Sequence, residues 1–265
     1  TVYRAIDDAL AALMALVDKR TLVVVFSSHG MGPNYSADHL LRSMLRGVLT
    51  GRTGNGGAYA RLNRLWETFP PPLRAALRPL QQRVRSGLKR TETRRGLCFQ
   101  VPNNASYSAI RANLAGREPN GRLAAAAAVD ALFERLATEL PRFENATTGT
   151  PVVERVLRVE ALWPGRDARD TLPDFLVQWR QDAPVSALRH PQLGLLRGIY
   201  RGPRTGEHRE QGLLVMAGPG VVSGEIEAAV DMIDLAPTLS AYLGVELADT
   251  DGRVLEMLRK GSTTT

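Results

Sequence analysis

Two histidines lie beside glycines at the ends of apolar runs. His29 stands one residue beyond the run Thr21–Ser27 and precedes Gly30, whereas His208 stands in a polar loop before the run Gly212–Ala217. Ligands of open α/β sheets bind beyond the carboxyl ends of strands, and neutral imidazole is a common zinc ligand. The pair therefore suggests a metal site that the fold assembles, although His29 alone could simply cap a turn.

Other reactive side chains are few. His39 lies ten residues after His29 and could reach the same pocket, but its position in an expected helix favours a helix-surface residue. Cys98 is the one cysteine, so neither an intrachain disulfide nor a cysteine-based zinc cluster can form. Its apolar neighbours predict a small buried core residue rather than a nucleophile.

The elements that must position these side chains alternate between helical and extended patterns, which predicts an α/β fold. Glycine after the last helical run predicts the end of that helix at Gly244. Helices are expected over residues 3–18, from Ser36–Asp38 onward, from 124 to near Pro141, and over Ile233–Leu243. Strands are expected over Thr21–Ser27, in CFQVPNN and SAIRANL, in PVVERVLRVEALW, over Leu172–Trp179 and over Gly212–Ala217.

The basic charge of the chain is local. The whole chain carries a net charge of +7, whereas the segment Arg52–Arg95 has eleven basic and two acidic residues, a net charge of +9. Its glycines and the prolines of Phe69–Leu73 predict an insertion or lid over about 50–96. A basic patch could also bind nucleic acid, but Arg-rich helix faces are common, and this reading is disfavoured.

The composition suits a globular protein of 265 residues with a substantial core. No apolar run approaches the roughly 20 residues of a membrane-spanning helix, and no signal pattern is visible. These observations predict a cytoplasmic protein with no membrane partner. The chain begins with Thr1 and runs at once into a helical pattern, which suggests a start in the middle of a domain.

Four stretches in this order carry a resemblance to a known family: VVVFSSHGMG, GEHREQGLLVMAGPG, DMIDLAPTLSAYLG and DTDGRVL. Together they resemble the C-terminal part of the alkaline phosphatase superfamily, nearest to its type I phosphodiesterase and nucleotide pyrophosphatase branch. AIRANLAGREPNG and LPDFLVQW are also similar to segments of bacterial members. The resemblance covers most of the chain apart from the basic stretch.

The resemblance implies a mixed, largely parallel sheet flanked by helices, with residues 1–265 forming a partial domain. It also implies two divalent metal ions, usually zinc, that hydrolyse phosphate or sulfate esters. By motif, His29 matches a ligand of the metal beside the nucleophile, and His208 matches a ligand of the other metal.

This sequence departs from the family pattern in two ways. Ser28 stands where the family has a metal-binding aspartate, and a neutral hydroxyl cannot supply that charge. The family's nucleophile and its Asp-x-x-x-His ligands precede the part that this chain resembles, so a missing N-terminal segment is expected to provide them. Three readings follow: the C-terminal portion of a metal-dependent phosphoester hydrolase, a degenerate non-catalytic relative that binds or has a structural role, and a polyanion-binding module.

Overall fold

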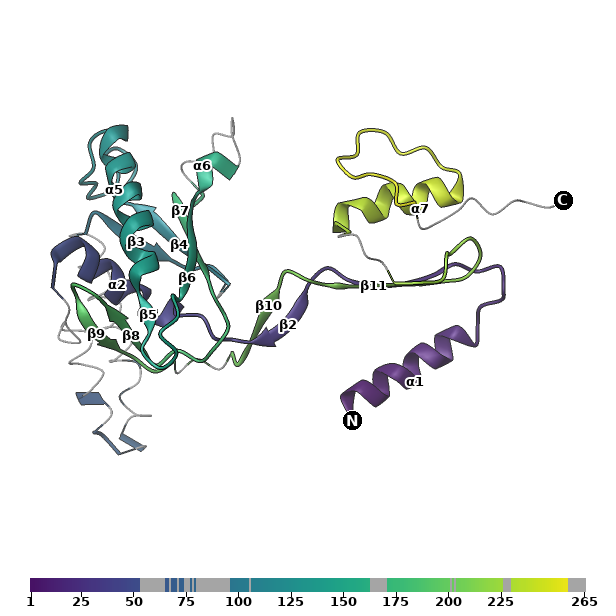
Figure 1. Cartoon of the computed structure of the whole chain (residues 1–265), viewed down its shortest axis with the longest axis horizontal. Helices are drawn as coiled ribbons and strands as arrows, with labels where there is room; N and C mark the ends of the chain where they lie inside the picture. The colour runs from purple at the N-terminus through teal and green to yellow at the C-terminus, as the bar shows by residue number, and fades with distance from the viewer. Residues whose placement is uncertain are drawn as a thin grey trace. The chain divides into compact units, whose positions relative to one another are not determined.

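The protein is a mixed α/β chain with several small antiparallel sheets, as Figure 1 shows. The computed structural model describes residues 1–52, 65–66, 68–70, 72–73, 77, 79, 96–104, 106–162, 171–200, 202, 204–225 and 230–256. The predicted α/β class is therefore confirmed.

The regular elements follow the chain in mixed order. The helices of the described part are α1 (Val2–Met14), α2 (Asp38–Thr50), α5 (Ala126–Glu139), α6 (Val159–Leu162) and α7 (Leu235–Leu243), with the 3₁₀ turns η1 (Leu140–Arg142) and η2 (Met232–Asp234). Its strands are β1 (Val23–Ser27), β2 (Gly30–Pro33), β3 (Cys98–Val101), β4 (Tyr107–Ala112), β5 (Glu144–Asn145), β6 (Val153–Arg158), β7 (Phe175–Trp179), β8 (Ala187–His190), β9 (Gly194–Arg197), β10 (Gly206–Arg209) and β11 (Leu213–Ala217).

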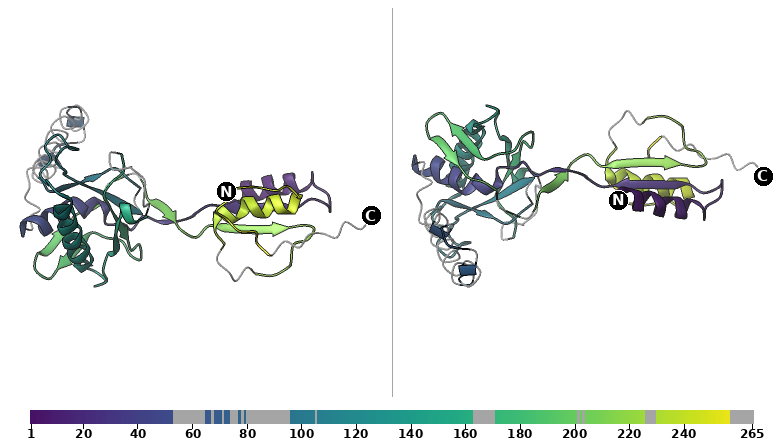
Figure 2. Two further views of the ribbon diagram at one scale, coloured as in Figure 1. Left: turned by 90° about the horizontal axis from the view of Figure 1, so that it is seen from above. Right: turned by 90° about the horizontal axis from the view of Figure 1, so that it is seen from below.

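The chain forms two compact units. Unit 1 contains residues Thr1–Met31 and His208–Thr265, and unit 2 contains Gly32–Glu207. In unit 1, β1 and β11 pair antiparallel with Val25 opposite Val215. Helices α7 and α1 lie on opposite sides of this two-stranded ribbon (Figures 1 and 2). The ribbon therefore brings together segments from both ends of the sequence.

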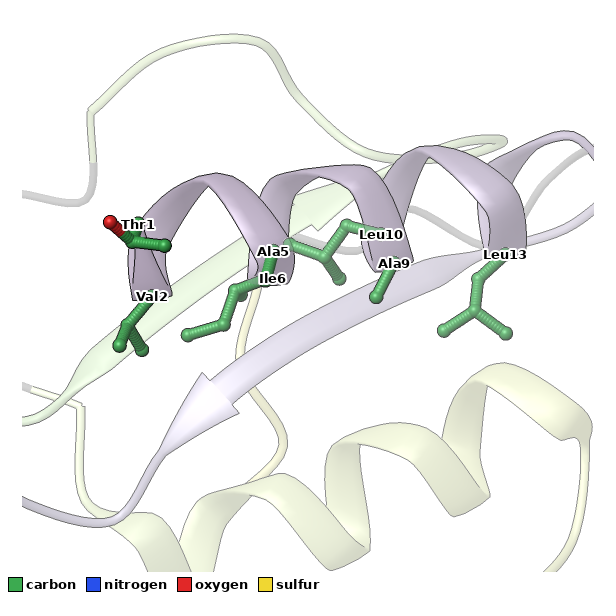
Figure 3. A pocket seen from close by; sticks show the side chains of 7 residues that line it. All are labelled: Thr1, Val2, Ala5, Ile6, Ala9, Leu10 and Leu13. Carbon is green, nitrogen blue, oxygen red and sulfur yellow. The ribbon is translucent and has the colours of Figure 1, made fainter.

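Helix α1 has an apolar stripe that the described part of the chain does not bury. Val2, Ile6, Leu10 and Leu13 project from one side of the helix (Figure 3), at the spacing of an amphipathic helix. No residue of α1 is buried, and Leu13 is 61% exposed. In unit 1, the strands also expose apolar side chains, including Phe26 and Val215.

Unit 2 contains the main hydrophobic core. A four-stranded sheet has the order β3-β4-β7-β6, and a smaller sheet has the order β5-β8-β9. Helix α2 buries Leu41, Met44 and Val48 at helical spacing, and these side chains belong to the same core cluster as Ile110 and Phe175. The hydrophobic core of unit 2 thus includes the apolar face of helix α2 packed against a sheet.

A polar cluster fixes α2 to the larger sheet. The indole Nε1–H of Trp179 donates to Ser108 Oγ at 2.8 Å, and the Ser108 hydroxyl donates to Asp38 Oδ1. The side-chain amide of Gln100 donates to the same carboxylate oxygen at 2.7 Å. Because Asp38 is the first residue of α2, the start of this helix is bonded to two strands.

An ion pair fixes the loop after β4. The guanidinium of Arg117 donates to both oxygens of Asp174, at 2.9 and 2.7 Å, and its Nη2 also donates to the carbonyl of Ala112. Asp174 Oδ2 in turn accepts the backbone N–H of Ala112 at 2.6 Å. The AIRANLAGREPNG and LPDFLVQW stretches are therefore joined by a closed polar network.

Several predicted boundaries differ from the structure. Helix α1 ends at Met14 rather than near residue 18. The strand expected over PVVERVLRVEALW ends at Arg158, where the short helix α6 begins. The helix after the glycine turn begins at Asp38 but has no side-chain cap, because the Ser36 hydroxyl donates to Asn34 instead.

The predicted largely parallel sheet is not seen in the described residues. The strand pairs with a defined register, β1–β11, β3–β4, β4–β7, β6–β7, β5–β8 and β8–β9, are all antiparallel. Pairs such as β3–β4 and β8–β9 are sequence neighbours, and a short connection can join only antiparallel strands. Most of the predicted basic lid lies outside the described residues, and the single partial domain stays a prediction.

Candidate metal-binding histidine pair

His29 is held at the end of β1 by backbone geometry. β1 ends at Ser27, whose hydroxyl donates to the carbonyl of His29 at 2.7 Å. Gly30 then begins β2. A Cβ at Gly30 would lie 2.4 Å from the carbonyl oxygen of Gln211, so the residue after His29 must be glycine for this approach.

His208 lies on β10, five residues before the start of β11 at Leu213. The intervening Gly212 passes close to the end of β1: a Cβ there would lie 2.0 Å from the Ser27 carbonyl oxygen and 3.2 Å from the His29 nitrogen. The β1–β11 register places Ser27 opposite Leu213. Gly212 therefore allows the two histidine-bearing segments to approach each other.

The two imidazoles are in contact. Their Nδ1 atoms are 3.0 Å apart across a sequence separation of 179 residues. The ring centroids are 4.0 Å apart with an interplanar angle of 70°. A nitrogen–nitrogen distance of this size is a hydrogen bond when one Nδ1 carries a proton and the other does not. The expectation that β1 and β11 share one sheet and bring His29 and His208 to one edge is confirmed.

The pair is open to solvent and has carbonyl oxygen nearby. Both imidazoles are exposed, and His29 Nδ1 lies 3.3 Å from the carbonyl oxygen of Gly30. Ser28, the residue at the aspartate position of the resembling family, is also exposed. Among the described residues, no group of three or more His, Cys, Asp or Glu side chains could hold a metal ion. The contact that defines the described site is therefore the one between the two imidazoles.

The expectation that His39 is a helix-surface residue is wrong. His39 is part-buried in unit 2, and its Nε2 lies 3.0 Å from the carbonyl oxygen of Gly198. Its ring also meets Tyr200 edge-on, with the centroids 5.8 Å apart. Burial lowers the pKa of His39, so the neutral ring serves as a structural link within unit 2.

Cys98 behaves as predicted. It is buried in the core of unit 2, and burial raises the pKa of its thiol to about 12. Since the thiolate is the reactive form, this cysteine is not a nucleophile at neutral pH.

One group of polar residues that the sequence analysis did not single out supports unit 1. The carboxylate of Asp234 accepts the backbone N–H of Arg253 at 2.9 Å, and the Thr238 hydroxyl accepts the backbone N–H of Leu255 at 2.9 Å. A Cβ at Gly252 would lie 2.1 Å from the carbonyl oxygen of Ile233. The aspartate and threonine of DMIDLAPT were the sequence signal for this group, because side chains of both types readily form hydrogen bonds with the backbone.

No helix in the described ranges has the length and apolar character needed to cross a bilayer. Comparison of the chain with known protein families, with characterised proteins and with solved structures finds no match.

Proposed function

We propose that this chain is the C-terminal portion of a metal-dependent phosphoester hydrolase of the phosphodiesterase, nucleotide pyrophosphatase or phosphatase type, in the cytoplasm. The observation that carries the proposal is the 3.0 Å contact between the Nδ1 atoms of His29 and His208. Residues so far apart in sequence meet at the end of a strand, which is where α/β folds bind ligands. The order of the four motifs supports the same reading.

The two imidazoles fit a divalent cation. Zinc binds imidazole nitrogen at about 2.0–2.1 Å, and two nitrogens 3.0 Å apart can both lie at that distance from one ion. Each Nδ1 must then be free of its proton, so both rings would carry the proton on Nε2. A bound zinc ion supplies Lewis acidity toward a phosphoryl oxygen.

The pair by itself accounts for one shared cation. The resembling family holds two ions and assigns one histidine to each, with carboxylates completing both positions. Ser28 supplies no negative charge, so a second ion depends on ligands outside the described residues. We propose that an N-terminal segment provides them, together with the nucleophile.

The exposed apolar surface of unit 1 supports an alkaline phosphatase-like sheet. β1 contains three valines followed by Phe26 and Ser27, and helices lie on both sides of the β1–β11 ribbon. Strands apolar on both faces are typical of the interior of parallel α/β sheets, and a two-stranded ribbon is marginally stable alone. Further strands beside the ribbon would bury Phe26 and Val215.

Ser28 favours a second candidate function, a non-catalytic relative that keeps the fold and binds a ligand or partner. A site without a carboxylate beside the dication binds the metal ion more weakly. Weak metal binding is what a non-catalytic relative would show. The two candidates predict the same histidine contact but differ in metal occupancy and turnover.

Zinc content and hydrolysis of bis(p-nitrophenyl) phosphate distinguish these candidates. We expect zinc to bind the wild-type protein and to be lost from the His29→Ala and His208→Ala variants. The matched control is His39→Gln, which lies in unit 2 and should keep its zinc. Turnover by the protein that includes the upstream coding sequence supports the hydrolase, zinc binding without turnover supports the non-catalytic relative, and zinc content unaffected by either alanine variant rejects the site.

A further inference from the structure

The apolar stripe of α1 forms an open groove on unit 1. Its volume is about 480 Å³, and the side chains that line it all come from α1 (Figure 3). Val2, Ile6 and Leu13 are exposed, and α1 has no buried residue. A contiguous apolar surface of this kind marks a site of interaction, so the groove requires an occupant.

The charges of α1 argue against a membrane surface as that occupant. The helix has one basic and two acidic side chains, Arg4, Asp7 and Asp8. At helical spacing, all three fall on the side of α1 opposite the stripe. Amphipathic helices that bind anionic membranes have a polar face rich in lysine and arginine, which this helix lacks. A protein surface is therefore the better partner.

The spacing of the apolar residues is that of a helix–helix contact. Val2, Ile6, Ala9 and Leu13 follow one another at intervals of four, three and four residues, which is the pattern of core positions in a coiled coil. Helix α1 has 13 residues, which span about 20 Å at a rise of 1.5 Å per residue. The groove therefore suits another helix of similar length.

The stripe is complementary in size to a second copy of itself. When two copies of α1 pack antiparallel about a two-fold axis, core positions whose residue numbers sum to the same value face each other. Ile6 then faces Ala9 of the other copy, and Val2 faces Leu13. Facing a large side chain with a small one fills a layer without overlap, and the two-fold axis repeats each contact. Antiparallel packing also places the opposite ends of the two helix dipoles side by side.

We propose that α1 is the interface of a symmetric homodimer, in which the stripe of one copy packs antiparallel against the stripe of a second copy. The Ile6 side chain of each copy fills the space beside Ala9 of the other. The inference does not depend on the proposed hydrolase function, because neither His29 nor His208 takes part.

Sedimentation velocity of the full chain over a range of concentrations tests the proposal. The wild-type protein should dimerise reversibly. Ile6→Asp places two carboxylates in the interface and should weaken the dimer by at least about 100-fold, because buried charges without partners are strongly unfavourable. The control Leu162→Asp adds the same charge at an exposed apolar position of unit 2 and should leave the dimer unchanged. Far-UV circular dichroism should show that both variants are folded, since α1 has no buried residue.

A size exchange tests the antiparallel packing itself. Ile6→Ala alone leaves a void in the layer and Ala9→Ile alone overfills it. Each single variant should weaken the dimer by at least about tenfold, since every substitution occurs twice in the dimer. The double variant Ile6→Ala/Ala9→Ile exchanges the two side chains across the two-fold axis. It should restore dimerisation to within about threefold of the wild type, because the two positions are coupled.

Three outcomes would overturn the proposal. A wild-type chain that stays monomeric at every concentration would show that a second copy does not occupy the groove, and binding of that monomer to phosphatidylglycerol vesicles would assign the groove to a lipid surface. A dimer unaffected by Ile6→Asp would have its interface elsewhere. A double variant that dimerises no better than its weaker single variant would reject the antiparallel contact of Ile6 with Ala9.

Discussion

At the scale of single residues, the contact between His29 and His208 is the feature most suited to chemistry. The two imidazoles are exposed and only 3.0 Å apart at Nδ1. Their neighbour Ser28 has no charge, so any cation at this position lacks the carboxylate that the resembling family provides. The consequence is a site whose metal affinity should respond strongly to one substitution.

We expect Ser28→Asp to raise the zinc affinity of the protein, because it restores an anionic ligand beside a dication. Isothermal titration with zinc measures the effect. Ser223→Asp adds the same charge at another exposed position of unit 1 and serves as the control. Equal affinities for the two aspartate variants would contradict the assignment of Ser28.

The Arg117–Asp174 pair should contribute strongly to the stability of unit 2. The two side chains are 7% and 19% exposed, and removing one partner of a buried pair costs about 3 kcal/mol. We expect Asp174→Asn to lower the free energy of unfolding in urea by about this amount. Asp130→Asn removes the partner of Arg158 in a pair whose carboxylate side chain is 51% exposed. A similar loss in both variants would show that burial is not the cause.

The stability of unit 2 should fall in mildly acidic solution. Burial lowers the pKa of both His39 and His190 below the ordinary histidine value of about 6.5, so the unfolded chain binds protons more readily than the folded chain. The stabilisation is full above about pH 6.5 and is lost as the pH falls toward the lowered pKa values. Thermal unfolding monitored by circular dichroism should give a lower Tm at about pH 5 than at about pH 7. The double variant His39→Gln/His190→Gln should show a smaller decrease, and an equal decrease would contradict the explanation.

At the scale of elements, the approach of the loop before β11 to the end of β1 is the critical contact. Gly212→Ala would place a Cβ 2.0 Å from the Ser27 carbonyl oxygen, where no real Cβ can remain. We therefore expect this variant to separate the histidines and to weaken zinc binding. Gly149→Ala introduces a strained residue, with φ of 72° in the wild type, into unit 2 and should leave zinc binding unchanged. Wild-type zinc affinity in Gly212→Ala would show that the contact is not needed.

Much of the element order could be predicted from the sequence. The valine-rich run Thr21–Ser27 and the run Gly212–Ala217 are the strands β1 and β11, and Gly244 ends α7 in a left-handed conformation. These signals are local, since apolar runs and glycine preferences depend on neighbouring residues. The β8–β9 hairpin and the short strands β2 and β10 were not predicted, because their few residues form strands through pairing with distant backbone.

The candidate site was predictable in part, because some of its signals are also local in the sequence. Glycines beside His29 and His208 indicated sharp turns, and the motif order indicated that both belonged to one site. The structural role of His39 could not be deduced, because the acceptor, the carbonyl of Gly198, lies 159 residues away.

At the scale of the whole molecule, the uneven distribution of charge allows a test of the third hypothesis, a polyanion-binding module. The segment Arg52–Arg95 carries a net charge of +9. Most of it lies outside the described residues, but Arg52 is described and is exposed as expected. We expect only weak binding to random single-stranded oligonucleotides at physiological salt. Fluorescence anisotropy at two salt concentrations measures it. Tight binding that falls steeply with salt would favour the nucleic-acid module, because each neutralised phosphate releases a counterion.

The discontinuity of unit 1 sets an order of events during synthesis. All of unit 2 lies between Met31 and His208, so the ribosome completes it before β11 exists. At about 5–20 residues per second, the valines of β1 wait on the order of 10–40 s for their partner strand. During that interval the nascent chain presents an unpaired apolar strand, and His29 has no second imidazole beside it. The histidine pair is therefore among the last features of the described structure to form.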